Sequence, residues 1–249
     1  MSIVLATGNR RSRLAERGHD LYETPAVAVQ ALLRVEDLPH VIWEPAAGRG
    51  AIVQVLREAG HIVVAQDLVD YGHPDIQSGI DFLTEAAAPA GCEAIVTNPP
   101  YKNGLDGKFA AKAIELVPRV YLLCRLAFLE SQRRSNVLDG GCLSRVYAFK
   151  SRLPMMHRDG WEGPKAQSAM AFAWFVWDRN HRGGKPKIER IGTKRCSICD
   201  QQFIGRDGAQ TCSNRCRQKA YRRRVTDNVE GGRLTVTAPG CSAVDRGRR

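Results

Sequence analysis

The sequence contains no apolar stretch that approaches the roughly 18 consecutive residues needed for a membrane-spanning helix. Its N-terminus has no apolar core of the kind that a secretory signal peptide carries. No segment of the chain repeats another. These absences exclude a membrane span and favour a cytoplasmic protein.

Residues 1–181 also lack a net charge, because their 20 basic and 20 acidic side chains cancel. The formal charge of +11 therefore comes entirely from residues 182–249, which contain 17 basic and 6 acidic side chains. Positive charge concentrated in one segment predicts binding to a polyanion, because Lys and Arg displace the counterions condensed on a phosphate backbone. On charge alone, a solvated, disordered basic tail is the alternative.

The chain of 249 residues is long enough for one α/β core and a small appended module. Eight cysteines in a cytoplasmic chain argue against a disulfide framework. Four of them form the pattern Cys196-x2-Cys199-x12-Cys212-x3-Cys216, which is the spacing of a structural zinc site. Four thiolates complete a tetrahedral shell, so we expect structural zinc that stabilises a module too small to fold alone.

Apolar strands alternate with amphipathic helices along most of the chain. Helices are expected over 24–35, where Thr24 is a plausible N-cap, over 51–59 and over 109–116. Strands are expected over 40–43, 61–66, 94–97, 120–123, 146–150 and 171–177. This alternation predicts an α/β fold with a mostly parallel central sheet.

A glycine-rich loop, Glu44-Pro-Ala-Ala-Gly48-Arg-Gly50, lies between a strand and a helix. Glycines at these positions let the backbone turn tightly and approach a ligand. Asp67 ends the next strand, where a carboxylate can accept hydrogen bonds from ribose hydroxyls. The acid that leads the loop suits a cationic amino group better than a pyrophosphate, which favours S-adenosylmethionine over NAD. An ordinary turn capped by glycines is the alternative.

The tetrapeptide Asn98-Pro99-Pro100-Tyr101 follows another strand. The side-chain oxygen of Asn98 and the carbonyl of Pro99 can each accept one N–H of a planar exocyclic amine, which aims its lone pair at a methyl donor. The prolines stiffen the loop, and Tyr101 offers a π-face to an extruded base. An ordinary Asn-Pro-Pro turn is the alternative.

Together with Tyr22-Glu-Thr-Pro25, these two motifs occur in an order that resembles the adenine-specific branch of the amino-methylating DNA methyltransferases. The resemblance is closest to compact phage and prophage enzymes, and it covers about residues 20–192. It implies a Rossmann-like fold, S-adenosylmethionine as cofactor, double-stranded DNA as partner and methylation of adenine N6. The family often has a larger recognition domain, so a short or loosely read target is expected.

The resemblance also implies roles for individual residues. Thr24 and Tyr22 would lie at the methionine end of the cofactor, and Asp81 and Phe82 would flank its adenine. Trp161 is a candidate for stacking on the target base. The residues implied for the cofactor are Tyr22, Thr24, Glu44, Gly48, Gly50, Asp67, Asp81 and Phe82.

Basic side chains follow the third cysteine of the zinc pattern and surround Tyr221. They are Arg215, Arg217, Lys219, Arg222, Arg223 and Arg224. On a helix they would spread over much of the circumference, so several could reach phosphates at once. We expect them to bind DNA with little specificity, and a protein-docking surface is the alternative.

The expected organisation has four parts: a flexible arm over 1–19, a methyltransferase domain over 20–192, the zinc module with its basic helix over 193–226, and a disordered basic tail over 227–249. Planar amines on cytosine N4, RNA or a protein glutamine suit the same tetrapeptide. Asn98 leans toward adenine, because family members that act on cytosine more often begin this motif with Ser. An inactive, zinc-dependent DNA-binding protein is the alternative from another class.

Overall fold

The computed structural model describes residues 21–155, 170–181, 183–203 and 209–230. The expected N-terminal arm, Trp161 and residues 231–249 lie outside this described part. The chain divides into two compact units, residues 1–193 and 194–249. In the described part, no helix combines the length and the hydropathy that crossing a bilayer requires.

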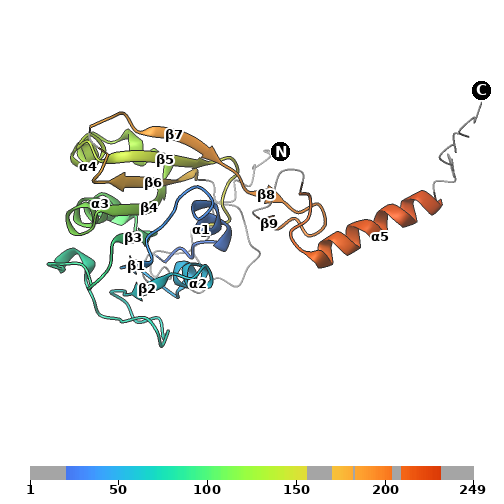
Figure 1. The fold of residues 1–249 in the computed structure, drawn as a ribbon, viewed down its shortest axis with the longest axis horizontal. Helices are drawn as coiled ribbons and strands as arrows, with labels where there is room; N and C mark the ends of the chain where they lie inside the picture. The colour runs from blue at the N-terminus through green and yellow to red at the C-terminus, as the bar shows by residue number, and fades with distance from the viewer. Residues whose placement is uncertain (1–20, 156–169, 182, 204–208, 231–249) are drawn as a thin grey trace, which may run out of the picture. The chain divides into compact units, whose positions relative to one another are not determined.

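The first unit is built on a seven-stranded sheet (Figure 1). The strand order is β2-β1-β3-β4-β6-β5-β7, and β6 runs antiparallel to both of its neighbours while the other pairings are parallel. The strands are β1 (Val41–Glu44), β2 (Ile62–Ala65), β3 (Ala94–Thr97), β4 (Arg119–Arg125), β5 (Leu143–Phe149), β6 (Phe172–Asp178) and β7 (Lys187–Ile191). The predicted α/β fold with a mostly parallel sheet is confirmed.

Helices cover both faces of this sheet (Figure 1). On one face lie α1 (Ala26–Leu32) and α2 (Ala51–Glu58), and on the other lie α3 (Leu105–Leu116) and α4 (Ser135–Leu138). Successive side chains of β6 point to opposite faces of the sheet. Trp174 lies on the face covered by α1 and donates its indole N–H to Ala28 O at 2.9 Å. Trp177 points the other way and donates to Val137 O of α4 at 2.7 Å. Both faces are buried, which explains the continuous apolar run of β6.

Short 3-10 helices connect several of these elements: η2 (Phe82–Thr84), η3 (Lys102–Gly104), η4 (Leu126–Glu130) and η5 (Gln132–Arg134). An ion pair fixes η5 against α3, because Arg134 donates two hydrogen bonds to Asp106 at 3.2 and 3.0 Å. Asp106 is 5% exposed, and its buried charge is satisfied by Arg134 together with the N–H of Gly107 at 2.9 Å.

Three local predictions were wrong. The first helix begins at Ala26 with Pro25 at its cap, and Thr24 makes no capping bond because its side chain is buried in a cavity wall. The third helix begins at Leu105, one turn earlier than 109, after Gly104 adopts the left-handed conformation. Strand β7 was missed because Lys187–Ile191 has no regular apolar alternation. It is held by backbone pairing with β5, and Ile188 stays 64% exposed.

The second unit contains a two-stranded ribbon and one helix. The ribbon pairs β8 (Lys194–Arg195) with β9 (Gln202–Phe203), and the helix is α5 (Asn214–Glu230). The helix therefore continues past residue 226, where the basic module was expected to end and a disordered tail to begin.

Candidate active site and metal centre

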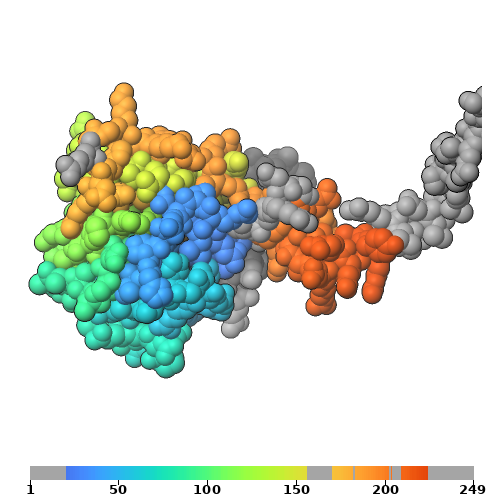
Figure 2. All heavy atoms as spheres, viewed as in Figure 1, coloured from blue at the N-terminus to red at the C-terminus, as the bar shows by residue number. Residues whose placement is uncertain are grey.

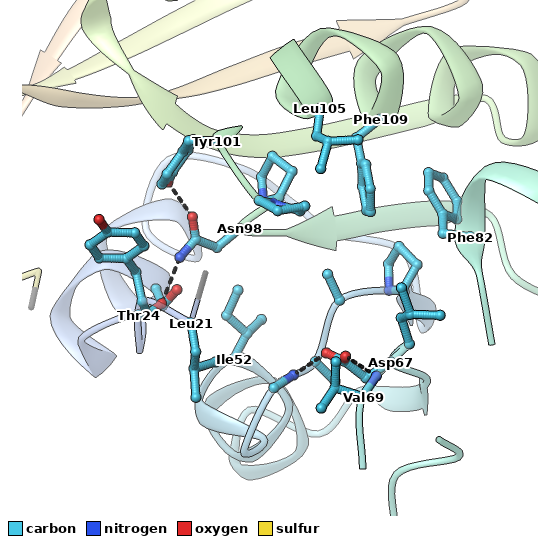
Figure 3. Close-up of a pocket in the computed structure, with 18 of the residues that line it drawn as sticks. Leu21, Thr24, Ile52, Asp67, Val69, Phe82, Asn98, Tyr101, Leu105 and Phe109 are labelled. Carbon is cyan, nitrogen blue, oxygen red and sulfur yellow. Dashed lines mark hydrogen bonds between the residues drawn. The ribbon is translucent and has the colours of Figure 1, made fainter. Parts of the chain in front are cut away.

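A cavity of about 440 Å³ opens at the carboxyl ends of β1 and β3, the edge where α/β sheets bind their ligands (Figure 3). Its wall brings together the two motifs that lie far apart in the sequence. The predicted site residues in this wall are Tyr22, Thr24, Gly48, Asp67, Asp81, Phe82, Asn98, Pro99, Pro100 and Tyr101. A ligand in this one cavity would therefore contact both motifs.

The glycine loop is held in place by Asp67. Gly48 N donates to Asp67 Oδ2 at 2.7 Å, and Val69 N donates to Asp67 Oδ1 at 2.8 Å (Figure 3). Gly48 has φ 56°, and a Cβ there would lie 2.7 Å from Leu21 Cδ1. Only glycine fits this position without displacing its neighbour. Both carboxylate oxygens of Asp67 thus bind backbone N–H groups that line the cavity.

Glu44 lies at the end of β1 with no exposed surface, beneath the loop rather than in the cavity wall. Its Oε1 accepts from Ala46 N at 3.1 Å, whereas its Oε2 and the neighbouring Thr97 Oγ1 have no hydrogen-bond partner. Burial raises the pKa of Glu44 to about 8 and outweighs the Ala46 N–H, which lowers it. The unpartnered Oε2 leaves this carboxyl able to form one more hydrogen bond.

Gly50 also lies outside the cavity wall. It caps α2 in the left-handed conformation with φ 84°, and a Cβ there would lie 3.2 Å from His73 Nε2. Its position shapes the turn into α2 rather than the cavity itself.

The part of the cavity wall around Phe82 is apolar. Phe82 is 2% exposed, with its ring edge-on to Trp43 at 5.1 Å and tilted against Phe109 at 4.8 Å. Asp81 precedes it and accepts a hydrogen bond from Leu83 N at 3.0 Å through Oδ1. An acid beside a buried aromatic wall fits an adenine ring with its exocyclic amine.

Asn98 is fixed at both ends of its side-chain amide (Figure 3). Its Nδ2 donates to Tyr22 O at 2.9 Å, and its Oδ1 accepts from the Tyr101 hydroxyl. The same hydroxyl lies 2.9 Å from Leu123 O on β4. An amide oxygen has two lone pairs, so Asn98 Oδ1 retains one for a substrate N–H.

Tyr101 is surrounded by rings and one cation. The rings of Tyr22 and Phe172 are tilted against it at 5.9 and 6.0 Å. The guanidinium carbon of Arg125 lies 4.8 Å from its centroid. Sequence reasoning missed Arg125, whose one signal was its place as a charged residue directly after the apolar run of β4.

In the second unit, the Sγ atoms of Cys196, Cys199, Cys212 and Cys216 all lie within 4.8 Å of one another. Cys212 Sγ is 3.5 Å from Cys199 Sγ and 3.6 Å from Cys216 Sγ. Tetrahedral zinc with Zn–S bonds of about 2.3 Å spaces its sulfurs by roughly 3.8 Å. The predicted four-cysteine cluster therefore forms and fits zinc.

Backbone N–H groups also favour a thiolate in this cluster. Desolvation raises the pKa of Cys196, but N–H groups of Cys199, Ile198 and Cys212 outweigh it and lower this pKa to about 6. The described basic side chains of α5 are exposed, and Tyr221 among them is 70% exposed. Figure 2 shows long side chains of this segment, in orange-red, projecting from the helix.

No model of a known protein family and no curated protein sequence matches this chain. Solved structures match its fold. A protein assigned to the class I S-adenosylmethionine-dependent methyltransferases of Listeria monocytogenes gives a TM-score of 0.50 at 11% sequence identity. The match covers 75% of this chain and 69% of that one.

Two further structures are similar at lower scores. A protein assigned as an RNA methyltransferase of Pyrococcus horikoshii gives a TM-score of 0.49 at 14% identity, over 68% of this chain and 90% of its own. A type I restriction-modification methyltransferase subunit of Streptococcus thermophilus gives 0.47 at 11% identity, over 79% and 50%. The Listeria match shows that this chain has the Rossmann-like fold of class I methyltransferases.

Proposed function

We propose that this protein is an S-adenosylmethionine-dependent methyltransferase that acts on N6 of an adenine extruded from double-stranded DNA. The observation that carries the proposal is the shared cavity: the glycine loop and the tetrapeptide Asn98–Tyr101 line one space at the carboxyl edge of the sheet. A methyl donor held by the first would face an amine held by the second. The methyltransferase fold supports this reading.

The residues that would hold the cofactor divide between its two ends. Thr24 and the loop at Gly48 would take the methionine part, with the buried Glu44 carboxyl near its amino group. Asp67 would accept the ribose hydroxyls, and Asp81 and Phe82 would contact the adenine. The bound cofactor supplies a methyl group on a cationic sulfur, which is already activated for displacement.

The remaining chemistry belongs to the tetrapeptide. Asn98 Oδ1 and Pro99 O would each accept one N–H of the target amine, so that its lone pair points along the line of transfer. After taking up the methyl group, the amine would release one proton to solvent, which leaves a neutral product nitrogen. Because two prolines stiffen the acceptors, little orientation is lost at reaction.

The second unit supports a nucleic-acid substrate. We assign zinc to the four-cysteine cluster as a structural ion, since four thiolates leave no position open for a substrate. The zinc would anchor α5, whose exposed side chains Arg215, Arg217, Lys219, Arg222 and Arg223 would contact phosphates together with Arg224. Such contacts give affinity without sequence readout.

The test is mass spectrometry of nucleosides from the DNA of cells that express the protein. N6-methyladenine is expected with the intact protein and absent with Asn98→Ala. Asn180→Ala is the matched control, because Asn180 lies exposed on the turn after β6 and its substitution should leave the mark unchanged.

Other outcomes correct the proposal in defined ways. N4-methylcytosine would keep the mechanism and change the base. Label transfer from the cofactor only to RNA, or only to a protein glutamine, would replace the substrate. DNA binding without transfer to any of these would favour an inactive DNA-binding protein.

A further inference from the structure

Arg125 is the last residue of β4 and lies at the same edge of the sheet as Asn98. Strands β3 and β4 are parallel, and Thr97 pairs with Leu122. The carboxyl ends of the two strands therefore lie beside each other, at the edge where α/β sheets bind their substrates. Phe172 of β6 pairs with Arg125 of β4, and its ring contacts that of Tyr101.

The guanidinium of Arg125 lies over the ring of Tyr101. Its central carbon is 4.8 Å from the centroid of that ring, a cation–π contact. Such a contact uses the charge of a guanidinium and none of its N–H donors. Tyr101 thus orients Arg125 without using its hydrogen-bonding capacity.

Arg125 differs from two other partly buried arginines of this unit. Arg134 is paired with Asp106, and Arg145 is paired with Glu36. Across the described residues, no carboxylate forms an ion pair with Arg125, and its Nε is buried out of reach of a ligand. The two terminal nitrogens of its guanidinium are therefore the donors that an anion can meet.

We propose that Arg125 is a positioning residue that binds a backbone phosphate next to the extruded nucleotide. This inference rests on the function proposed above and specifies its substrate class. A nucleotide whose base reaches Asn98 carries a phosphodiester on each side of its sugar, and the planar fork of arginine matches a phosphate oxygen pair. A glutamine side chain in a protein carries no such anion, so Arg125 selects nucleic acid.

The experiment measures how the full-length protein binds a short fluorescent DNA duplex in the presence of S-adenosylhomocysteine. One adenine of the duplex stands opposite a mismatched base, which lowers the energy needed to extrude it. In Arg125→Gln, the slope of log affinity against log salt concentration should become shallower by about one unit, since one phosphate contact is lost. An unchanged slope would overturn the proposal.

Arg119→Gln is the matched control. Arg119 starts the same strand, at the opposite edge of the sheet, and donates to Asp37 O at 3.3 Å. The slope for Arg119→Gln should equal that of the unmodified protein. An equal decrease in both variants would show a general effect of charge and would also overturn the proposal.

A second measurement uses the unmodified protein and so does not depend on how a variant folds. Neutral methylphosphonates replace the phosphates on both sides of the mismatched adenine, or two phosphates near one end of the duplex. Neutralisation beside the adenine should weaken binding about three- to tenfold more than neutralisation at the end. Equal losses would contradict a specific phosphate contact.

Transfer of labelled methyl groups to the same duplexes separates this inference from the function on which it rests. A decreased slope without any methyl transfer by the unmodified protein would retain the phosphate contact and refute the enzyme. Methyl transfer with an unchanged slope in Arg125→Gln would do the reverse.

Discussion

At the scale of single residues, the most unusual group is the carboxyl of Glu44. It has no exposed surface, and burial raises its pKa to about 8 from an ordinary value of 4.5. It is therefore mostly protonated at neutral pH in the folded chain and ionised in the unfolded chain. Its protonation couples folding to pH.

Glu44→Gln tests this coupling. Between pH 4.5 and 8 the folded state binds the proton and the unfolded state does not, so unmodified protein should lose stability as pH rises. The loss has an upper limit of about 1.4 kcal/mol per pH unit and stops above the folded pKa. Urea denaturation across this range should give a flatter profile for Glu44→Gln.

Glu58→Gln serves as the control, because Glu58 is an exposed carboxylate at the end of α2. Its profile should run parallel to that of the unmodified protein. If the Glu44→Gln profile also runs parallel, the Glu44 carboxyl is not the titrating group.

At the scale of elements, the loop between β1 and α2 depends on glycine for two separable reasons. Gly48 combines a positive φ with a close contact to Leu21, whereas Gly60 has φ 94° and open space around its Cα. Substitution at Gly60 measures backbone strain alone. Substitution at Gly48 measures strain and collision together.

Gly60→Ala should destabilise the fold by about 1 kcal/mol. Gly48→Ala should destabilise it by more and should also weaken binding of S-adenosylhomocysteine, since the added methyl displaces Leu21 from the cavity wall. Calorimetric titration and urea denaturation of both variants provide the comparison. Equal effects at the two positions would show that the Leu21 contact is unimportant.

The sequence predicted the elements whose residues carry a strong apolar pattern and missed those that depend on distant partners. Strands β1, β3 and β6 are apolar runs and lie within a residue or two of their predicted bounds. Strand β7 has no such pattern, since its position comes from pairing with β5. The first turn of α3 contains Asp106, a charged residue that led the sequence analysis to start this helix later. The ion pair with Arg134, 28 residues away, allows Asp106 to be buried there.

At the scale of the whole molecule, the cavity residues belong to the first unit and most of the net positive charge to the second, which holds 13 basic and 5 acidic side chains. The motifs predicted a site because each carries its own chemistry. That they share a cavity could be inferred only from strand order. Arg125 escaped prediction because its partner ring, Tyr101, lies 24 residues earlier in the chain.

Cys212→Ser tests the second unit. The variant should lose bound zinc, and its affinity for duplex DNA should fall with a shallower salt dependence, because α5 loses its anchor. Elemental analysis and fluorescence anisotropy measure the two effects. Its affinity for S-adenosylhomocysteine should stay unchanged, since the cavity wall contains no cysteine.

Cys142→Ser is the control, as Cys142 is a half-buried thiol outside the cluster. It should keep both zinc and DNA affinity. Full DNA affinity in zinc-free Cys212→Ser would refute the role given to the module.

The hydroxyl of Tyr101 has two acceptors within reach, Asn98 Oδ1 and Leu123 O, but only one hydrogen to share between them. Whichever oxygen it leaves, the hydroxyl remains hydrogen-bonded to the other. A guest N–H can therefore bind Asn98 Oδ1 beside the hydroxyl or in its place, since the hydroxyl can turn toward the strand. Admitting a substrate then requires at most the rotation of one O–H bond, and no buried polar group is stranded.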